Sequence, residues 1–135
     1  MSACVGVQTV KLGHQQSWVL ASDLSAASQA RRHIAEACAG IPDETVYTAR
    51  LLVTELVSNA VLHGRGTVLL TVTRDDAGIR VEVHDESPRR PTIIDGPALA
   101  EHGAGLRLVS AMAGSWGTSS REAGRPGKRV WFTLP

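Results

Sequence analysis

Apolar residues recur with helical spacing in two consecutive stretches in the first half of the chain. The first stretch runs to about residue 39, where a glycine and a proline follow, and its start can be capped by Ser22, Asp23 or Ser25. The second runs from Asp43, which can cap it, to about Leu62. The spacing therefore predicts two helices, the second longer than the first.

The second predicted helix has two different faces. At about 100° per residue, its apolar positions form one stripe, made of Val46, Ala49, Val53, Leu56, Val57 and Ala60. A polar stripe on another side consists of Thr48, Glu55, Ser58 and Asn59. A helix that only covers a sheet needs one apolar stripe and a solvated back. The polar stripe, which leucines border, therefore indicates one wall of a pocket.

Alternating apolar and polar residues predict strands, chiefly in the second half. Residues 67–74 and 79–85 alternate in this way, and the turn between them ends in Gly78, where a positive φ is tolerated. Residues 116–122 and 129–134 form a second hairpin, and residues 17–21 form a short strand ahead of the helices. Trp116 and Trp131 are expected in the core, because large aromatic side chains dominate small cores.

These elements predict a single α+β domain with a two-layer sandwich architecture. A third helix is expected over residues 106–113, after a segment rich in proline and glycine. Residues 1–16 are weakly patterned, so we expect an N-terminal arm or edge strand there and one domain over residues 17–135. A chain of 135 residues is long enough to bury a substantial core.

The composition is that of a globular protein and excludes several classes. Hydrophobic residues make up 43% and charged residues 20%, with a formal net charge of +1, so no basic footprint indicates nucleic acid. No apolar run approaches the roughly 20 residues of a membrane span, and no signal peptide is visible. We therefore expect a cytoplasmic protein, with Cys4 and Cys38 as free thiols.

Three groups of residues are candidates for chemistry. Glu55 and Asn59 lie four residues apart and share a helix face; a carboxylate can take a proton, and an amide oxygen is a hard ligand suited to Mg²⁺. Asp85 ends a predicted strand and can accept a hydrogen bond from an amine. Gly103 and Gly105 precede a helix, where backbone N–H groups and the helix dipole favour an anion such as phosphate.

The order of these groups resembles the N, G1 and G2 boxes of the GHKL ATP-binding fold, also called the Bergerat fold, which gyrase and histidine kinases share. The D-x-S-x-x-x-P pattern from Asp85 through Ser87 to Pro91, together with the small size, resembles the branch of anti-sigma-factor serine/threonine kinases. The resemblance covers roughly residues 17–135. It implies a mixed, mostly antiparallel sheet that helices cover on one face.

The resemblance also implies roles for individual residues. Glu55 is the implied general base, Asn59 the ligand of Mg²⁺ and Asp85 the residue that reads the amino group of adenine. The other implied ATP-binding residues are His63, Ser87, Pro91, Gly103, Ala104, Gly105, Leu106 and Lys128. ATP and Mg²⁺ are the implied cofactors.

Lys128 departs from the wider family, whose members often place a threonine after the glycine of the last strand, where it helps to hold adenine. A lysine cannot accept a hydrogen bond, so we expect Lys128 either to alter adenine affinity or to lie along the rim of the pocket.

Two function classes remain open at this point. The first is an ATP–Mg²⁺ regulator that phosphorylates a serine or threonine of an anti-anti-sigma (antagonist) protein, with a sigma factor as a possible second partner and a homodimer as the implied assembly. The second is a module that holds a sigma factor or antagonist without phosphotransfer. A histidine-kinase catalytic domain ranks below both, since the chain has no room for a dimerising helix with a phospho-accepting histidine. Neither nucleic acid nor a membrane is expected as a direct partner.

Overall fold

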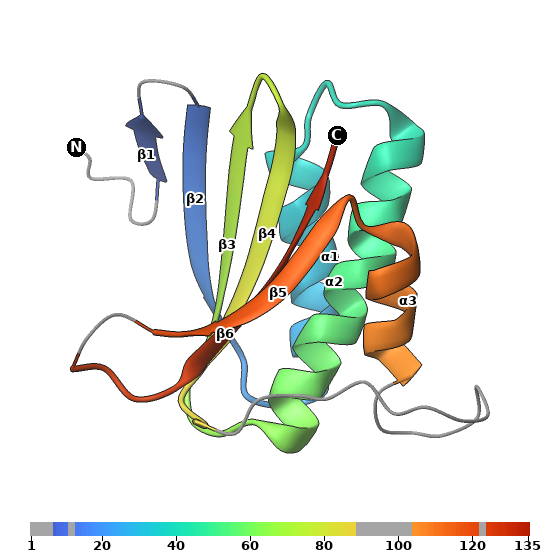
Figure 1. Ribbon diagram of the computed structural model, residues 1–135. Helices are drawn as coiled ribbons and strands as arrows, with labels where there is room; N and C mark the ends of the chain where they lie inside the picture. Colours follow the sequence, from blue (N-terminus) through green and yellow to red (C-terminus); the bar gives the residue numbers. More distant parts are fainter. Residues whose placement is uncertain (1–6, 11–12, 89–103, 122–123) are drawn as a thin grey trace.

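The computed structural model describes residues 7–10, 13–88, 104–121 and 124–135. Within them, six strands form one sheet in the order β1-β2-β3-β4-β6-β5, and three helices pack on one of its faces (Figure 1). The elements are β1 (Val7–Val10), β2 (Gly13–Leu20), α1 (Ala26–Ala37), α2 (Asp43–His63), β3 (Val68–Asp75), β4 (Gly78–Asp85), α3 (Ala104–Met112), β5 (Ser115–Ser120) and β6 (Lys128–Leu134).

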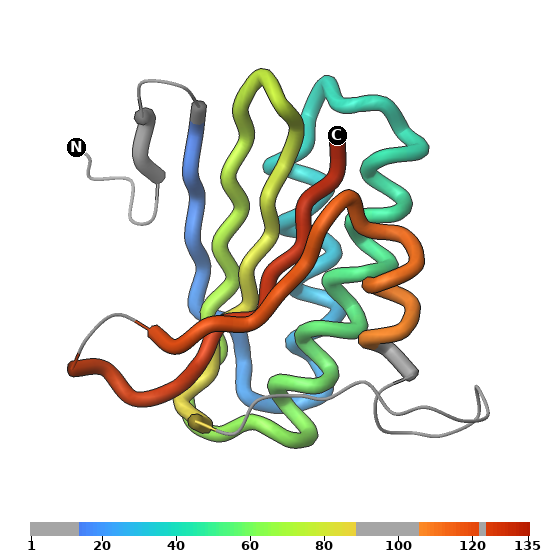
Figure 2. The backbone as a smooth tube through the Cα atoms, viewed as in Figure 1, coloured from blue at the N-terminus to red at the C-terminus, as the bar shows by residue number. Residues whose placement is uncertain are grey.

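This arrangement confirms the predicted α+β two-layer sandwich. Every neighbouring pair of described strands is antiparallel, so the mixed sheet that the resemblance implied has no parallel pair here. β1 pairs with β2 and forms one edge of the sheet, and β5 forms the other. The backbone trace shows α1 and α2 as neighbouring, antiparallel rods behind the sheet (Figure 2).

The helix ends differ from the predicted ones. Asp43 does not cap α2; the residue before the helix is Pro42, which makes no side-chain capping hydrogen bond. Asp43 and Glu44 lie inside that turn, where their charge interacts favourably with the helix dipole. α1 follows Ser25, one of the three residues predicted as possible caps, but the Ser25 hydroxyl makes no capping bond and donates to Asp23 instead.

The core lies between α1, α2 and the helix-facing side of the sheet. Of the predicted apolar stripe of α2, five residues are buried and Val46 is half-buried; Leu52 is fully buried as well. From the sheet, alternate residues point inward and meet this stripe; they include Leu70, Val81, Val83, Val130 and Phe132. The same alternation puts the last residue of β4, Asp85, on the helix-facing side.

Trp131 was predicted to lie in the core, and this prediction is wrong. It alternates with the buried Val130 and Phe132, so it lies on the face of the sheet away from the helices, where it is half-buried. The Arg80 guanidinium stacks over its ring at 4.1 Å from the centroid. Gly117 lies opposite Trp131, and a Cβ there would come within 2.8 Å of the ring. Trp116 is half-buried and packs against the core.

Glu82 is the charged centre of this outer face. Its carboxylate accepts hydrogen bonds from Arg80 at 2.7 Å and from His84 at 3.1 Å. Burial alone would raise the pKa of Glu82, but the hydrogen bonds from His84 and Arg80, together with the charges of those groups, lower the pKa to about 2. The carboxylate is therefore more stable in its ionised form in the folded protein than in the unfolded chain.

A pH series tests this network. The folded pKa of Glu82 is depressed, so its contribution is present above the ordinary value of 4.5 and is lost as the pH falls towards about 2. Glu82→Gln should lower the free energy of unfolding at pH 7 by on the order of 2–3 kcal/mol, and the difference from the parent should shrink below about pH 4.5. Urea unfolding measures it, with Asp76→Asn in the exposed β3–β4 turn as the control. A difference that stays constant from pH 7 to pH 3 would contradict the assignment.

Candidate functional site

The polar stripe predicted on α2 is present in the structure. Glu55 and Asn59 are both half-buried, and they lie one helical turn apart on the same face. With a rise of about 1.5 Å per residue, Asn59 lies roughly 7–8 Å and Glu55 roughly 13–14 Å from Gly64 along the helix axis. The two residues therefore form a polar track, that is, a line of half-buried polar side chains on one face of α2 towards its C-terminal end.

Asp85 lies at that end of the helix. It is the last residue of β4, it is 2% exposed, and its Oδ1 accepts a hydrogen bond from the backbone N–H of Ser87 at 2.7 Å. Gly64 ends α2 against this carboxylate: a Cβ on Gly64 would lie 2.7 Å from both Cγ and Oδ2 of Asp85. Only glycine allows the end of the helix to come this close.

A second glycine, Gly127, lets β6 approach the main chain of Asp85. Gly127 precedes β6 with φ of +111°, a conformation that favours glycine, and a Cβ there would overlap the backbone oxygen of Asp85. Asp85 therefore lies between the end of α2 and the start of β6, and both approaches require the absence of a side chain.

Lys128 pairs with Asp85. The two residues are directly opposite each other in the β4–β6 register, so both side chains point to the helix-facing side. The ammonium of Lys128 donates to Oδ2 of Asp85 at 2.8 Å and to Oδ1 at 3.0 Å. Lys128 is 6% exposed, so it does not lie along the rim as one of the two expectations had it.

The loop after α2 is hydrogen-bonded to Glu86, the residue that follows Asp85. Glu86 accepts a hydrogen bond from the backbone N–H of Thr67 at 2.6 Å, and its own N–H donates to the carbonyl of Arg65 at 2.8 Å. The bond from the Thr67 backbone, followed by a contribution from its side chain, lowers the pKa of Glu86. Gly66, with φ of +72°, leaves room for the Glu86 carboxylate. These contacts fix where β4 ends relative to α2.

The other predicted site residues are distributed as follows. His63 is the last residue of α2 and is exposed, and Ser87 is buried directly after the fastened loop. Ala104 and Gly105 form the start of α3, two residues earlier than predicted. The side chain of Leu106 is 1% exposed and packs in the core, so only its backbone could face an anion. Pro91 and Gly103 lie outside the described residues.

Sequence reasoning assigned no role to Gly64, Gly127 or Glu86. A glycine directly after the last residue of a helix was the available signal for Gly64, and a glycine at the start of the final strand was the signal for Gly127. For Glu86 no such signal exists, because its partner Thr67 lies 19 residues away and is brought close only by the fold.

The side chains of Glu55 and Asn59 suit a cation that is bound together with a phosphate ligand. They do not suit a metal site built from protein ligands alone. Among the described residues, no three histidine, cysteine or acidic side chains gather as metal ligands. Asn59 offers one amide oxygen with Glu55 one turn away. Mg²⁺ keeps several waters and takes few protein ligands, usually with substrate phosphates, which matches this sparse set.

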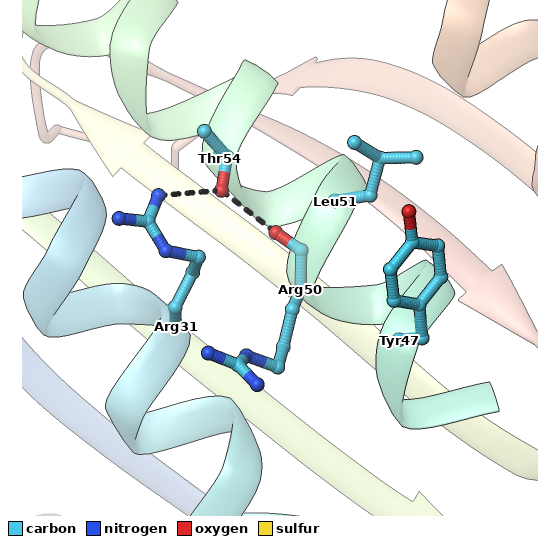
Figure 3. A pocket seen from close by; sticks show the side chains of 5 residues that line it. All are labelled: Arg31, Tyr47, Arg50, Leu51 and Thr54. Carbon is cyan, nitrogen blue, oxygen red and sulfur yellow. Dashed lines mark hydrogen bonds between the residues drawn. The ribbon is translucent and has the colours of Figure 1, made fainter. Parts of the chain in front are cut away.

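A separate hollow lies on the outer surface of the helix pair and is not part of this group. It has a volume of about 370 Å³, and α1 and α2 line it with Arg31, Tyr47, Arg50, Leu51 and Thr54 (Figure 3). Arg31 donates to the hydroxyl of Thr54 at 3.0 Å, and this hydroxyl donates to the carbonyl of Arg50 at 2.7 Å. The hollow shares no residue with the surroundings of Asp85.

The histidine kinase-like ATPase domain family matches residues 20–134, almost the whole chain. The protein therefore belongs to this family, and ATP is the ligand that the family implies. No curated protein matches the chain. None of the helices in the described part of the chain is long and apolar enough to cross a membrane.

A double-mutant cycle tests the pairing of Asp85 with Lys128. Asp85→Asn leaves a buried ammonium without a counter-charge, which typically costs about 3–5 kcal/mol of stability. Asp85→Asn combined with Lys128→Met removes both charges, so its loss should be clearly smaller than the sum of the two single losses. Urea unfolding of the four proteins gives the coupling free energy. Additive losses would mean that the two groups do not interact.

Proposed function

We propose that this protein is an ATP- and Mg²⁺-binding regulator that phosphorylates a serine or threonine of a partner protein. The observation that carries the proposal is the track on α2. Glu55 and Asn59 share one half-buried face, and this face leads to a buried carboxylate, Asp85, at the end of the helix. This order supports the proposal that Glu55 acts as general base, Asn59 as metal ligand and Asp85 as the group that recognises the nucleobase.

Each residue has a distinct task in this proposal. Asp85 accepts a hydrogen bond from the amino group of adenine, and the backbone at the start of α3 faces the phosphates. The Asn59 amide oxygen binds Mg²⁺, which neutralises phosphate charge. Glu55 takes the proton of the acceptor hydroxyl while the hydroxyl oxygen forms a bond to the γ-phosphorus of ATP. The bond between the γ-phosphorus and the bridging oxygen of the β-phosphate breaks, and ADP leaves.

The partners in this proposal come from the resemblance to anti-sigma-factor kinases. The phosphoryl acceptor is an anti-anti-sigma antagonist protein, a sigma factor is the second partner, and the kinase acts as a homodimer in the cytoplasm. What supports this choice is the D-x-S-x-x-x-P pattern that begins at Asp85, whose first residues form the hydrogen bond between Asp85 and the Ser87 backbone.

A second candidate function is favoured by a specific observation. The carboxylate of Asp85 already holds the ammonium of Lys128, so the base subsite is partly satisfied by the protein itself. In this second candidate function, the protein binds its partner with little dependence on ATP and transfers no phosphoryl group. This candidate is a protein-interaction module that sequesters a sigma factor or an antagonist.

Replacing Asn59 tests the metal role. Asn59→Ala should weaken ATP binding about tenfold or more in Mg²⁺ and change it little in EDTA, since the amide acts through the metal. Calorimetry under both conditions measures the effect. Ser58→Ala, on the same polar stripe, serves as the control. An equal loss in Mg²⁺ and in EDTA would make Asn59 a structural residue.

Replacing Glu55 separates the two candidate functions. Glu55→Gln keeps the shape of the side chain but has no basicity at neutral pH. It should retain ATP and partner binding while phosphotransfer falls about 10²–10⁴-fold. The assay is transfer from labelled ATP to a co-purified partner, with Glu36→Gln on the exposed face of α1 as the control.

The outcomes of this assay differ for each candidate. If the parent transfers no phosphate to any partner that it binds, the kinase proposal is wrong and the interaction module stands. If Glu55→Gln transfers at the parental rate, the protein is a kinase but Glu55 is not its base.

A further inference from the structure

The Asp85 carboxylate has few hydrogen-bonding directions left for a ligand. Two carboxylate oxygens offer about four acceptor sites. The Ser87 N–H takes one on Oδ1, and the Lys128 ammonium takes one on each oxygen. Within the described part of the chain, one acceptor site of Asp85 remains, on Oδ2. This oxygen also faces Gly64, where even a methyl group would come within 2.7 Å.

The pair is also shielded from solvent. The side chain of Asp85 is 3% exposed and that of Lys128 is 8% exposed. The backbone at Gly64 closes on the carboxylate of Asp85, that at Gly127 closes on its main-chain oxygen, and the cross-strand register holds Asp85 and Lys128 opposite each other. A ligand that needs the carboxylate therefore has to displace the ammonium, because Gly64 closes the remaining direction at Oδ2.

We propose that Lys128 is an intramolecular stand-in for the amino group of the nucleobase, and that it closes the base subsite at Asp85. The ammonium makes with Asp85 the kind of hydrogen bonds that an exocyclic amine would make. Nucleotide binding then requires the separation of a buried ion pair. The inference rests on the proposed nucleotide site, and it makes Lys128 the residue that sets affinity there.

If Lys128 closes the base subsite, removing it should change ATP affinity in the opposite direction from the change expected if Lys128 recognised the base. If Lys128 held the base through its third N–H, removing the lysine would weaken binding. If Lys128 competes with the base, removing it strengthens binding, since a buried ion pair no longer has to be broken. A gain of about 10- to 100-fold in ATP affinity is expected for Lys128→Thr.

The experiment is calorimetric titration with Mg-ATP and Mg-GTP of the parent, Lys128→Thr and Lys128→Gln. Lys128→Thr leaves Asp85 buried without a counter-charge and could destabilise the fold. Lys128→Gln keeps an N–H donor for Asp85 and removes the charge. The expected order of ATP affinity is Lys128→Thr, then Lys128→Gln, then the parent. Thermal melting with and without ATP checks the fold and gives a second measure of binding.

Arg129→Thr is the matched control. It removes one positive charge from the adjacent residue of β6, whose side chain lies on the opposite face of the sheet and bonds to Ser119 at 2.8 Å. Its ATP affinity should stay within about twofold of the parent, which shows that net charge alone does not produce the gain.

Three results would overturn the inference. Equal or weaker ATP binding by both Lys128 variants would make the lysine neutral or part of base recognition. Tighter binding of Mg-GTP than of Mg-ATP by the parent would show that the ammonium reads a carbonyl oxygen of the base. In both cases the proposed nucleotide site would stand. If neither the parent nor any Lys128 variant binds nucleotide, the proposed site fails together with the inference.

Discussion

The pairing of β4 with β6 brings a carboxylate and an ammonium group together inside the protein, and the geometry of the candidate site depends on this pair. Asp85 and Lys128 are direct cross-strand neighbours, and both point towards the helices. A carboxylate buried in this way is costly unless it is paired and hydrogen-bonded, and Asp85 has both an ammonium and a backbone N–H. Two glycines then let α2 and β6 approach it.

The position of the polar track on α2 follows from the packing of this helix on the sheet. The apolar stripe of α2 must face the sheet, and this fixes the rotation of the helix about its axis. The polar stripe with Glu55 and Asn59 is thereby turned towards the edge of the apolar contact, where its side chains are half-buried. The loop fastened by Glu86 then sets the end of the helix against Asp85.

Much of the fold could be predicted from the sequence, because its two periodicities are strong. The long helix and the hairpin around Gly78 were placed to within two residues, since their alternation and turn chemistry are local. The position of Trp131 was predicted wrongly, since residue type favoured the core while the alternation of β6 put the ring on the outer face, under Arg80. Helix caps were missed because Asp43 lies inside the first turn.

The site was only partly predictable, for a physical reason. Glu55 and Asn59 are linked by helical spacing, which a sequence displays. The contact between Asp85 and Lys128 joins residues 43 positions apart, and it depends on strand register, which the sequence alone does not determine. The lysine could therefore be noticed as unusual, but its effect on Asp85 required the structure.

Nucleotide binding beside Asp85 is tested most directly by titrating the ¹⁵N-labelled protein with Mg-ATP and recording the chemical shifts of its backbone amides. We expect the largest shifts on Asn59, Gly64 and Ser87, which lie on the polar track of α2 and around Asp85. Shifts confined to the helix surface around Arg31 and Arg50, or no shifts at millimolar Mg-ATP, would contradict it.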